Sequence, residues 1–301
     1  MKLKDYKNIY FVGIGGIGMS SLARYFNNFN INIYGYDKVQ SLLCEDLERE
    51  GMKIHYTDNP VEISVKREET LVVYTPAIPK KNKEFKYFSD NKFRMLKRSE
   101  VLGEITKNHF TIAVAGTHGK TTTSTLLAHI LRNCGLDCTA FLGGISSNYN
   151  SNFIMGSEKS ILVVEADEFD KSFLTLNPDI AIITSVDADH LDVYQNKENL
   201  MLAFTDFIDK INKGGSLFLE SSISSTLVNR SDVSIQKYSV SEDANYSSTN
   251  ISITNKGMRF DILYKNSTIT DFHLKMGGLY NVSNAVAAIS VAKKLNITDI
   301  E

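Results

Sequence analysis

The chain has 301 residues, of which 43% are hydrophobic and 23% are charged, and its formal net charge at pH 7 is −2. This length and composition predict a packed protein of two domains and exclude a disordered one. Since there is no basic surplus, neither a nucleic acid nor an acidic membrane surface is indicated as a partner.

The N-terminal residues are polar and lead directly into an apolar run, so they lack the apolar core of a secretory signal. No stretch of the sequence is long and apolar enough to span a bilayer. The cysteines are Cys44, Cys134 and Cys138, an odd number for which reduced cytosolic thiols are the simple interpretation. These features predict a cytoplasmic protein without a membrane partner, and they leave its oligomeric state open.

Short apolar runs alternate with helical patterns through most of the chain. The runs predict buried strands at residues 9–12, 31–34, 71–74, 111–115, 161–164, 180–184 and 216–219. After the first run, Met19, Leu22, Ala23 and Phe26 recur at the spacing of one helix face. Apolar strands that alternate with helices are typical of parallel sheets covered on both faces, so the sequence predicts the α/β class.

A second series of strands and helices begins at residue 111, after the polar segment 97–108. Because a glycine-rich turn follows the first strand of each series, we predict two α/β domains, residues 1–105 and 106–301. Residues 250–276 instead alternate apolar and polar positions around turn signals, which predicts a small antiparallel meander. A last helix is predicted from about residue 281 to 295.

The first glycine-rich turn reads Gly13-Ile14-Gly15-Gly16-Ile17-Gly18 and lies between a predicted strand and a predicted helix. Its glycines allow backbone N–H groups to approach a diphosphate, to which the helix N-terminus adds partial positive charge. Asp37 follows the second strand, at the place of an acid that binds a ribose. By itself this pattern indicates NAD as readily as another diphosphate, and the glycines could also serve only close helix–strand packing.

The second glycine-rich turn reads Gly116-Thr117-His118-Gly119-Lys120-Thr121-Thr122. Its two glycines free the backbone to wrap phosphates, Lys120 can bridge the β- and γ-phosphates of ATP, and the Thr121 hydroxyl suits Mg²⁺. The loop is shorter than the usual phosphate-binding loop, but it also stands between a strand and a helix. It therefore predicts an ATP site.

Acidic residues follow two later strands. Glu165 ends the run 161–164, and the cluster Asp187, Asp189, His190 and Asp192 follows the run 180–184. Because ligands gather at the carboxyl ends of the strands in an open parallel sheet, we expect Glu165 and His190 to lie near the Lys120 loop and Mg·ATP. The alternative for these acids is a solvated strand end or a capped turn.

Four motifs, in this order, resemble the Mur ligase family. They are Val12-Gly13-Ile14-Gly15-Gly16-Ile17-Gly18-Met19-Ser20, Gly116-Thr117-His118-Gly119-Lys120-Thr121-Thr122-Thr123, Glu165-Ala166-Asp167-Glu168 and Asp189-His190-Leu191-Asp192. The resemblance covers nearly all of the chain. It implies an N-terminal Rossmann-like domain that binds a UDP-sugar, followed by a P-loop-type central ATPase domain with a mainly parallel sheet and a small antiparallel meander. It also implies that the family's third, amino-acid-binding domain is absent, so an inactive fragment is expected.

The resemblance assigns roles at the matching positions. UDP-sugar binding falls to Gly13, Ile14, Gly15, Gly16, Ile17, Gly18, Asp37, Thr75, Pro76, Ala77, His118, Glu168 and Ser172. ATP binding falls to Gly116, Thr117, His118, Gly119, Lys120, Thr121, Thr122, Asn281 and Asn284. Lys120, Glu165 and His190 would be catalytic, and Thr121, Glu165 and His190 would hold Mg²⁺. Tyr280 stands where the family has a histidine, which puts a role for that side chain in doubt.

The implied reaction joins L-alanine to the carboxylate of UDP-N-acetylmuramic acid, with ATP, through an acyl phosphate, during peptidoglycan synthesis. A related ligase that attaches a recycled peptide to the same sugar acid is a close alternative. An NAD-dependent oxidoreductase rests on the first glycine-rich turn alone and leaves Lys120 and its acidic partners unexplained. A nucleotide-binding switch without enzymatic activity would need no second substrate domain.

Overall fold

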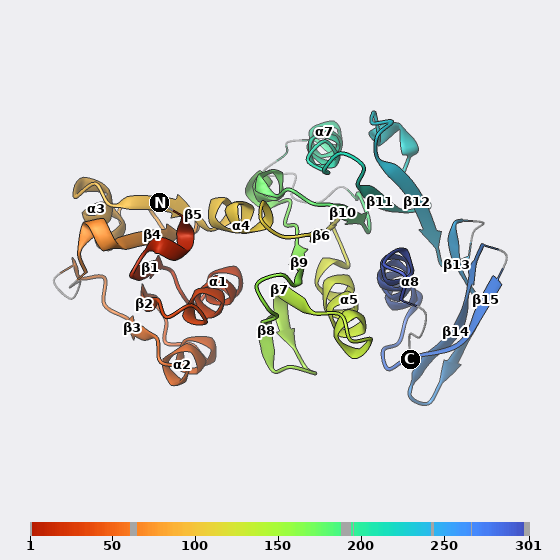
Figure 1. Ribbon diagram of the computed structural model, residues 1–301, viewed down its shortest axis with the longest axis horizontal. Helices are drawn as coiled ribbons and strands as arrows, with labels where there is room; N and C mark the ends of the chain where they lie inside the picture. Colours follow the sequence, from red (N-terminus) through yellow and green to blue (C-terminus); the bar gives the residue numbers. More distant parts are fainter. Residues whose placement is uncertain are drawn as a thin grey trace. The chain divides into compact units, whose positions relative to one another are not determined.

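The computed structural model of the chain describes residues 2–60, 65–187, 194, 196–241, 244–265 and 267–297 (Figure 1). The chain divides into two compact units, of which the first is Met1–Ile105 with Phe141–Phe153 and the second is Thr106–Ala140 with Ile154–Glu301. Among the residues just given, no helix is long and apolar enough to cross a membrane.

The first sheet has five strands in the order β3-β2-β1-β4-β5, and all of its neighbouring strands run parallel. The strands are β1 (Asn8–Val12), β2 (Asn32–Tyr36), β3 (Lys53–His55), β4 (Thr70–Tyr74) and β5 (Arg94–Lys97). The helices that connect them are α1 (Ile17–Asn27), α2 (Leu42–Arg49) and α3 (Lys83–Asp90), and α4 (Arg98–Thr106) follows β5. This strand order reverses beside β1, and ligands bind at such a reversal in doubly wound sheets.

One face of the first sheet packs against α3. Tyr10 and Val12 are two residues apart on β1, so they point to the same face, and both belong to a buried cluster with Phe88 of α3. The rings of Tyr10 and Phe88 lie 4.6 Å apart between centroids. The Tyr10 hydroxyl donates a hydrogen bond of 2.6 Å to the buried carboxylate of Glu84 at the start of α3. The helix that follows the 75–78 loop is therefore fixed to the central strand.

The second sheet has ten strands in the order β15-β14-β13-β12-β11-β10-β6-β9-β7-β8. The strands are β6 (Thr111–Ala115), β7 (Cys138–Ser146), β8 (Ser151–Ile154), β9 (Ile161–Glu165), β10 (Ile180–Ile183), β11 (Ser216–Glu220), β12 (Ser234–Ser239), β13 (Tyr246–Thr254), β14 (Gly257–Tyr264) and β15 (Ser267–Leu274). The pairs from β9 through β6, β10, β11 and β12 to β13 are parallel, whereas β13–β14 and β14–β15 are antiparallel. The predicted α/β class, parallel sheets and antiparallel meander are confirmed.

The helices of the second unit are α5 (Lys120–Asn133), α7 (Lys197–Ile208) and α8 (Leu279–Lys294), and its short 3-10 helices are η4 (Phe169–Thr175) and η5 (Ser225–Leu227). The first unit has the 3-10 helices η1 (Leu3–Asp5) and η3 (Arg67–Glu69). Helices α5 and α8 pack side by side, as Figure 1 shows. Helix α8 starts and ends close to the predicted limits 281 and 295. Gly135 adopts a positive φ of +79° just after α5, a conformation in which glycine often ends a helix.

Strands β3, β5 and β12 were not among the predicted runs, and two further segments differ from what the sequence alone suggested. The polar segment 97–108 is largely helical, since α4 occupies Arg98–Thr106. The residues Phe141–Phe153, which come after the second glycine-rich turn in the chain, group with the first unit. Strands β7 and β8 supply this segment, and neither strand was predicted.

The three cysteines differ in burial, which leads to a labelling prediction. Cys44 and Cys138 are buried, and Cys134 is half-buried at the end of α5. Burial raises the pKa of the Cys138 thiol to about 12. Because only the thiolate reacts, we expect iodoacetamide at pH 8 to alkylate Cys134 at least about 100-fold faster than Cys138. Mass spectrometry of the peptides over time measures both rates. In urea, where both thiols are exposed, the two rates should be similar. Equal rates in the folded protein would contradict the prediction.

Candidate functional site

The second glycine-rich turn, called the phosphate loop below, connects β6 to α5 through residues 116–119. Gly116 and Gly119 have φ angles of +131° and +84°, a region that side chains rarely adopt. The first N–H groups of a helix have no partner within the helix, and Gly119 at the N-cap has no side chain to cap them. The start of α5 can therefore receive the oxygens of an anion such as a phosphate.

Two hydroxyl residues after β10 hold this loop in place. Thr184 donates to the carbonyl of Ala115 at 3.1 Å and also contacts the carbonyl of His118. The Ser185 Oγ accepts from the backbone N–H of His118 at 2.9 Å and lies 2.8 Å from the Thr117 hydroxyl. Thr184 and Ser185 were not predicted as site residues. Their signal in the sequence was available, because they follow a strand that pairs with β6.

Lys120, the first residue of α5, forms a buried ion pair. Its Nζ donates to both carboxylate oxygens of Glu168, at 2.9 and 2.8 Å, and to the carbonyl of Gly116 at 2.7 Å. The Lys120 side chain is 12% exposed and that of Glu168 is fully buried. Glu168, which the resemblance assigned to sugar binding, thus forms an ion pair with the lysine of the phosphate loop. It orients the ammonium group at the place where a phosphate would enter.

Tyr194 forms a further hydrogen bond with Glu168. Its hydroxyl donates to the backbone carbonyl of Glu168 at 2.5 Å. Burial raises the pKa of Tyr194 to about 12, and the negative charge of Glu168 nearby acts in the same direction. The hydroxyl therefore stays protonated at neutral pH, so it remains a hydrogen-bond donor to the backbone of Glu168.

Thr121 and Glu165 come together beside Lys120. The Thr121 hydroxyl donates to a carboxylate oxygen of Glu165 at 2.8 Å. Glu165 ends β9, which pairs in parallel with β6, so both strands present their carboxyl ends at the same edge. Hydroxyl and carboxylate oxygens are the ligands that Mg²⁺ prefers, so this pair fits that cation.

The third predicted metal ligand, His190, lies outside the described residues, as do Asp189 and Asp192. Asp187 is described; its backbone N–H donates to the Thr117 hydroxyl at 3.1 Å. Within the described ranges, no group of three His, Cys, Asp or Glu side chains is placed to hold a metal ion.

The start of α8 lies beside the phosphate loop. Asn284 is 7% exposed, and its Oδ1 accepts from the Thr123 hydroxyl at 3.2 Å. The same oxygen would be 2.4 Å from a Cβ atom on Gly119, so the loop glycine and Asn284 are in close contact. Asn281 instead donates to the carbonyl of Gly277 at 2.7 Å, and Tyr280 is 72% exposed.

The glycine-rich turn of the first unit lies between β1 and α1. The backbone N–H groups of Gly13 and Ile14 both donate to the carbonyl of Tyr36, at 2.8 and 3.1 Å. The N–H of Gly15 donates to the Asp37 carboxylate at 2.8 Å. Asp37, predicted to hold a ribose, is therefore attached to the glycine-rich turn itself. Ile14 is fully buried, so its side chain packs inside the unit and is not presented to a ligand.

The loop after β4 approaches the same turn. A Cβ atom on Gly13 would lie 3.1 Å from side-chain carbons of both Thr75 and Ile78, whereas Pro76 and Ala77 are exposed. The residues 13–18, Asp37 and Thr75 thus meet where the strand order reverses, between β1 and its neighbours β2 and β4.

Besides Glu168, two more of the residues assigned to the sugar, Ser172 and His118, lie in the second unit. The Ser172 hydroxyl donates to the backbone carbonyl of Asp167 at 2.9 Å. The His118 side chain is 69% exposed, and its Nε2 lies 3.9 Å from the Asp187 carboxylate. His118 is thus the more accessible of the two to a ligand.

Two family models match the chain. The model described as Mur ligase family, catalytic domain, matches residues 8–110, and that of the Mur ligase middle domain matches residues 114–292.

Similar curated proteins include UDP-N-acetylmuramate–L-alanine ligases. That of Flavobacterium johnsoniae is 44% identical over 297 residues, and that of Porphyromonas gingivalis is 44% identical over 296. Each comparison covers 97% of this chain but only 64% and 65% of the respective relative, so the chain spans less than two thirds of their length.

Solved structures show the same fold. The UDP-N-acetylmuramate-alanine ligase MurC of Thermotoga maritima matches with a TM-score of 0.84 and 26% identity, over 96% of this chain and 65% of that one. The UDP-N-acetylmuramate:L-alanyl-gamma-D-glutamyl-meso-diaminopimelate ligase of Neisseria meningitides matches with a TM-score of 0.86 and 22% identity, over 98% of this chain and 95% of that one. At this identity the second likeness concerns the fold alone.

Proposed function

Because the chain belongs to the Mur ligase family, we propose that it forms part of an ATP-dependent ligase that joins L-alanine to UDP-N-acetylmuramic acid in the cytoplasm. The observation that carries this proposal is the presence of two phosphate-type loops, each at the carboxyl edge of its own sheet. Only the second loop has a lysine and a pair of oxygen ligands suited to Mg²⁺. This asymmetry fits a UDP-sugar on the first unit and ATP on the second.

In the proposed reaction, the lactyl carboxylate of the sugar acid attacks the γ-phosphorus of ATP and ADP leaves. The amine of L-alanine then attacks the carbonyl carbon of the acyl phosphate, and phosphate leaves as the amide forms. Two anions must approach each other in the first step. Lys120 and the N–H groups at the start of α5 would oppose this repulsion through fixed positive charge. A Mg²⁺ ion on Thr121 and Glu165 would neutralise further phosphate charge.

The ion pair with Glu168 gives Lys120 a defined place before ATP arrives. A long lysine side chain loses rotamer entropy when it is immobilised. In this chain, Glu168 and the Gly116 carbonyl already restrict Lys120 at the loop. ATP would then bind to a lysine that needs little further ordering.

Binding measurements on this chain test the proposal. We expect titration calorimetry to detect UDP-N-acetylmuramic acid and Mg·ATP but not NADH. NADH binding without any response to the UDP-sugar would instead support an oxidoreductase. Turnover of the full-length protein with L-alanine, compared with a tripeptide as the amine, separates the proposed ligase from the peptide ligase.

Substitution of Gly15 is expected to remove the UDP-sugar site selectively. A Cβ atom there would lie 2.6 Å from Sγ of Cys44 and 2.9 Å from the Asp37 carboxylate, so the turn would have to shift. We expect Gly15→Val to weaken UDP-sugar binding by about 100-fold or more, since a misplaced backbone cannot meet the diphosphate.

ATP binding by the same variant is the internal control and should stay unchanged. Gly51→Ala is a control elsewhere in the first unit, because nothing lies within 4 Å of a Cβ atom on Gly51. Since Gly51, unlike Gly15, has a positive φ of +94°, this variant also shows whether backbone strain away from the turn affects binding. Equal UDP-sugar affinities for Gly15→Val and Gly51→Ala would disprove the assignment of this turn.

A further inference from the structure

Strands β7 and β8 bring a segment of the second sheet into the first unit. Both strands belong to the ten-stranded sheet, yet Phe141–Phe153 groups with Met1–Ile105. Aromatic rings hold the segment against α1, since Tyr25 lies 5.6 Å from Phe141 and 6.2 Å from Phe153 between ring centroids. All three side chains are buried. Such apolar contacts attach the segment but do not by themselves fix its orientation.

A buried asparagine on β8 supplies that orientation. Asn152 is fully buried, and its Nδ2 donates to the carbonyl of Ile17 at 2.6 Å and to the Ser20 hydroxyl at 2.9 Å. Ile17 is the first residue of α1 and directly follows the N-cap Gly16. The amide of Asn152 is therefore attached to the first turn of the helix that the glycine-rich turn precedes.

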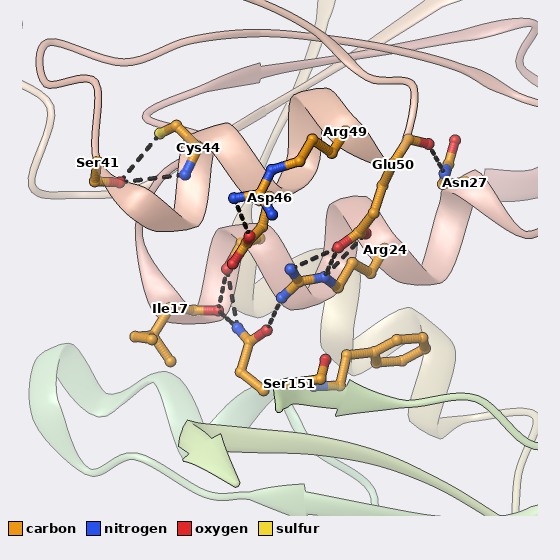
Figure 2. Close-up of polar contacts among 12 residues, drawn as sticks. Ile17, Arg24, Asn27, Ser41, Cys44, Asp46, Arg49, Glu50 and Ser151 are labelled. Carbon is orange, nitrogen blue, oxygen red and sulfur yellow. Dashed lines mark hydrogen bonds and ion pairs between the residues drawn. The ribbon is translucent and has the colours of Figure 1, made fainter. Parts of the chain in front are cut away.

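Arg24 determines which way this amide points. Its guanidinium is nearly buried and donates to both carboxylate oxygens of Glu50, at distances from 2.7 to 3.0 Å (Figure 2). Its remaining nitrogen donates to Oδ1 of Asn152. Because a guanidinium has only donors, Oδ1 must face Arg24, and the Nδ2 donors must then face the first turn of α1, at Ile17 and Ser20. A reversed amide would place two donors together and leave the Ile17 carbonyl against an acceptor.

We propose that Asn152 is a positioning residue for the UDP-sugar site, which it reaches through the first turn of α1. This inference rests on the proposed function, since the ligand is the diphosphate of that substrate. The N–H groups at the start of α1, directly after the glycine-rich turn, would contact the diphosphate, and their placement has to be accurate to a fraction of an ångström. Within the glycine-rich turn, the N–H groups of Gly13, Ile14 and Gly15 are already bound. Asn152 fixes the chain directly after that turn. The alternative is that Asn152 only stabilises the attachment of β8.

Two variants of the chain separate these roles. Asn152→Ala removes all three contacts to α1, with Ile17, Ser20 and Arg24, and we expect it to raise the Kd of UDP-N-acetylmuramic acid on the order of 10-fold. Asn152→Asp keeps the shape and the acceptor toward Arg24 but loses the donors, so it should fold and also bind weakly. Mg·ATP should bind both variants with wild-type affinity. Calorimetry well below the midpoint of thermal unfolding measures each Kd.

Phe153→Leu is the matched control. It weakens the aromatic contact of the next residue of β8 with Tyr25, but it leaves the hydrogen bonds of Asn152 to α1 in place. It should lower the unfolding temperature but leave the Kd of the UDP-sugar unchanged. If the Kd of all three variants follows their loss of stability, or if Asn152→Ala and Asn152→Asp bind as the wild type does, the positioning role is refuted. If the wild-type chain itself does not bind the UDP-sugar, the proposed function fails first.

Discussion

Replacement of Lys120 by alanine is expected to abolish ATP binding and also to destabilise the second unit. The Lys120 side chain is only 12% exposed and pairs with the fully buried carboxylate of Glu168. Removal of one partner of a buried ion pair leaves an uncompensated charge, at a cost of roughly 3–5 kcal/mol. We expect urea unfolding to show a loss of this size, and ATP affinity to fall by about 100-fold or more because the cation of the loop is gone.

A second substitution separates the two effects. In the background of Lys120→Ala, Glu168→Gln removes the buried charge and should restore most of the stability. It cannot restore the cation, so ATP binding should remain lost. Lys159→Ala, at an exposed lysine of the second unit, is the matched control for loss of a positive charge. ATP affinity near the wild-type value in the double variant would show that Lys120 does not bind phosphate.

Gly116→Ala is expected to have an effect of similar size for a different reason. The φ angle of Gly116 is +131°, and an added Cβ would lie 2.1 Å from the Thr184 hydroxyl and 2.8 Å from the backbone nitrogen of Ser185. These two residues hold the phosphate loop, and the backbone nitrogen cannot move away as a side chain could. Backbone strain and overpacking together cost roughly 2–5 kcal/mol. We therefore expect a clear loss of stability, measured in urea, and loss of ATP binding.

Gly135→Ala isolates the contribution of the backbone angle. Gly135 ends the same helix, has a φ of +79°, and has nothing within 4 Å of an added Cβ. It should lose only about 1–2 kcal/mol and keep wild-type ATP affinity. If Gly116→Ala behaves like Gly135→Ala in both measurements, contact with Thr184 and Ser185 does not control the loop.

Local patterns in the sequence account for most of the fold. The apolar runs predicted the parallel strands β1, β2, β4, β6, β9, β10 and β11, because a strand covered on both faces needs no polar positions. The parallel strands β3, β5 and β12 contain more polar residues and were not predicted. The alternation of apolar and polar residues in 250–276 predicted the antiparallel strands β13 to β15, because a strand with one solvent-exposed face has polar residues at every second position. These signals depend on neighbouring residues only, so one chain is enough to read them.

Contacts between distant residues were harder to predict. Lys120, Thr121 and Glu165 were expected together because strand ends of a parallel sheet meet at one edge, and the structure places them there; their roles toward ATP stay predictions. The pairing of Lys120 with Glu168 spans 48 residues and depends on how η4 folds back. Nothing in the local sequence around Asn152 indicates that its amide reaches Ile17, because that contact requires the aromatic packing of β8 on α1.

The attachment of Phe141–Phe153 to the first unit has a consequence for how the protein is made. Residues Met1–Ile105, which contain the five-stranded sheet, are synthesised first. Phe141, which packs against Tyr25, and Asn152, which accepts a hydrogen bond from Arg24, come 36 or more residues after Ile105. Domains fold in order as the chain leaves the ribosome. The nascent first unit therefore exposes an apolar surface on α1 until residue 153 has emerged, by which time β6 and α5 of the next unit have also been translated.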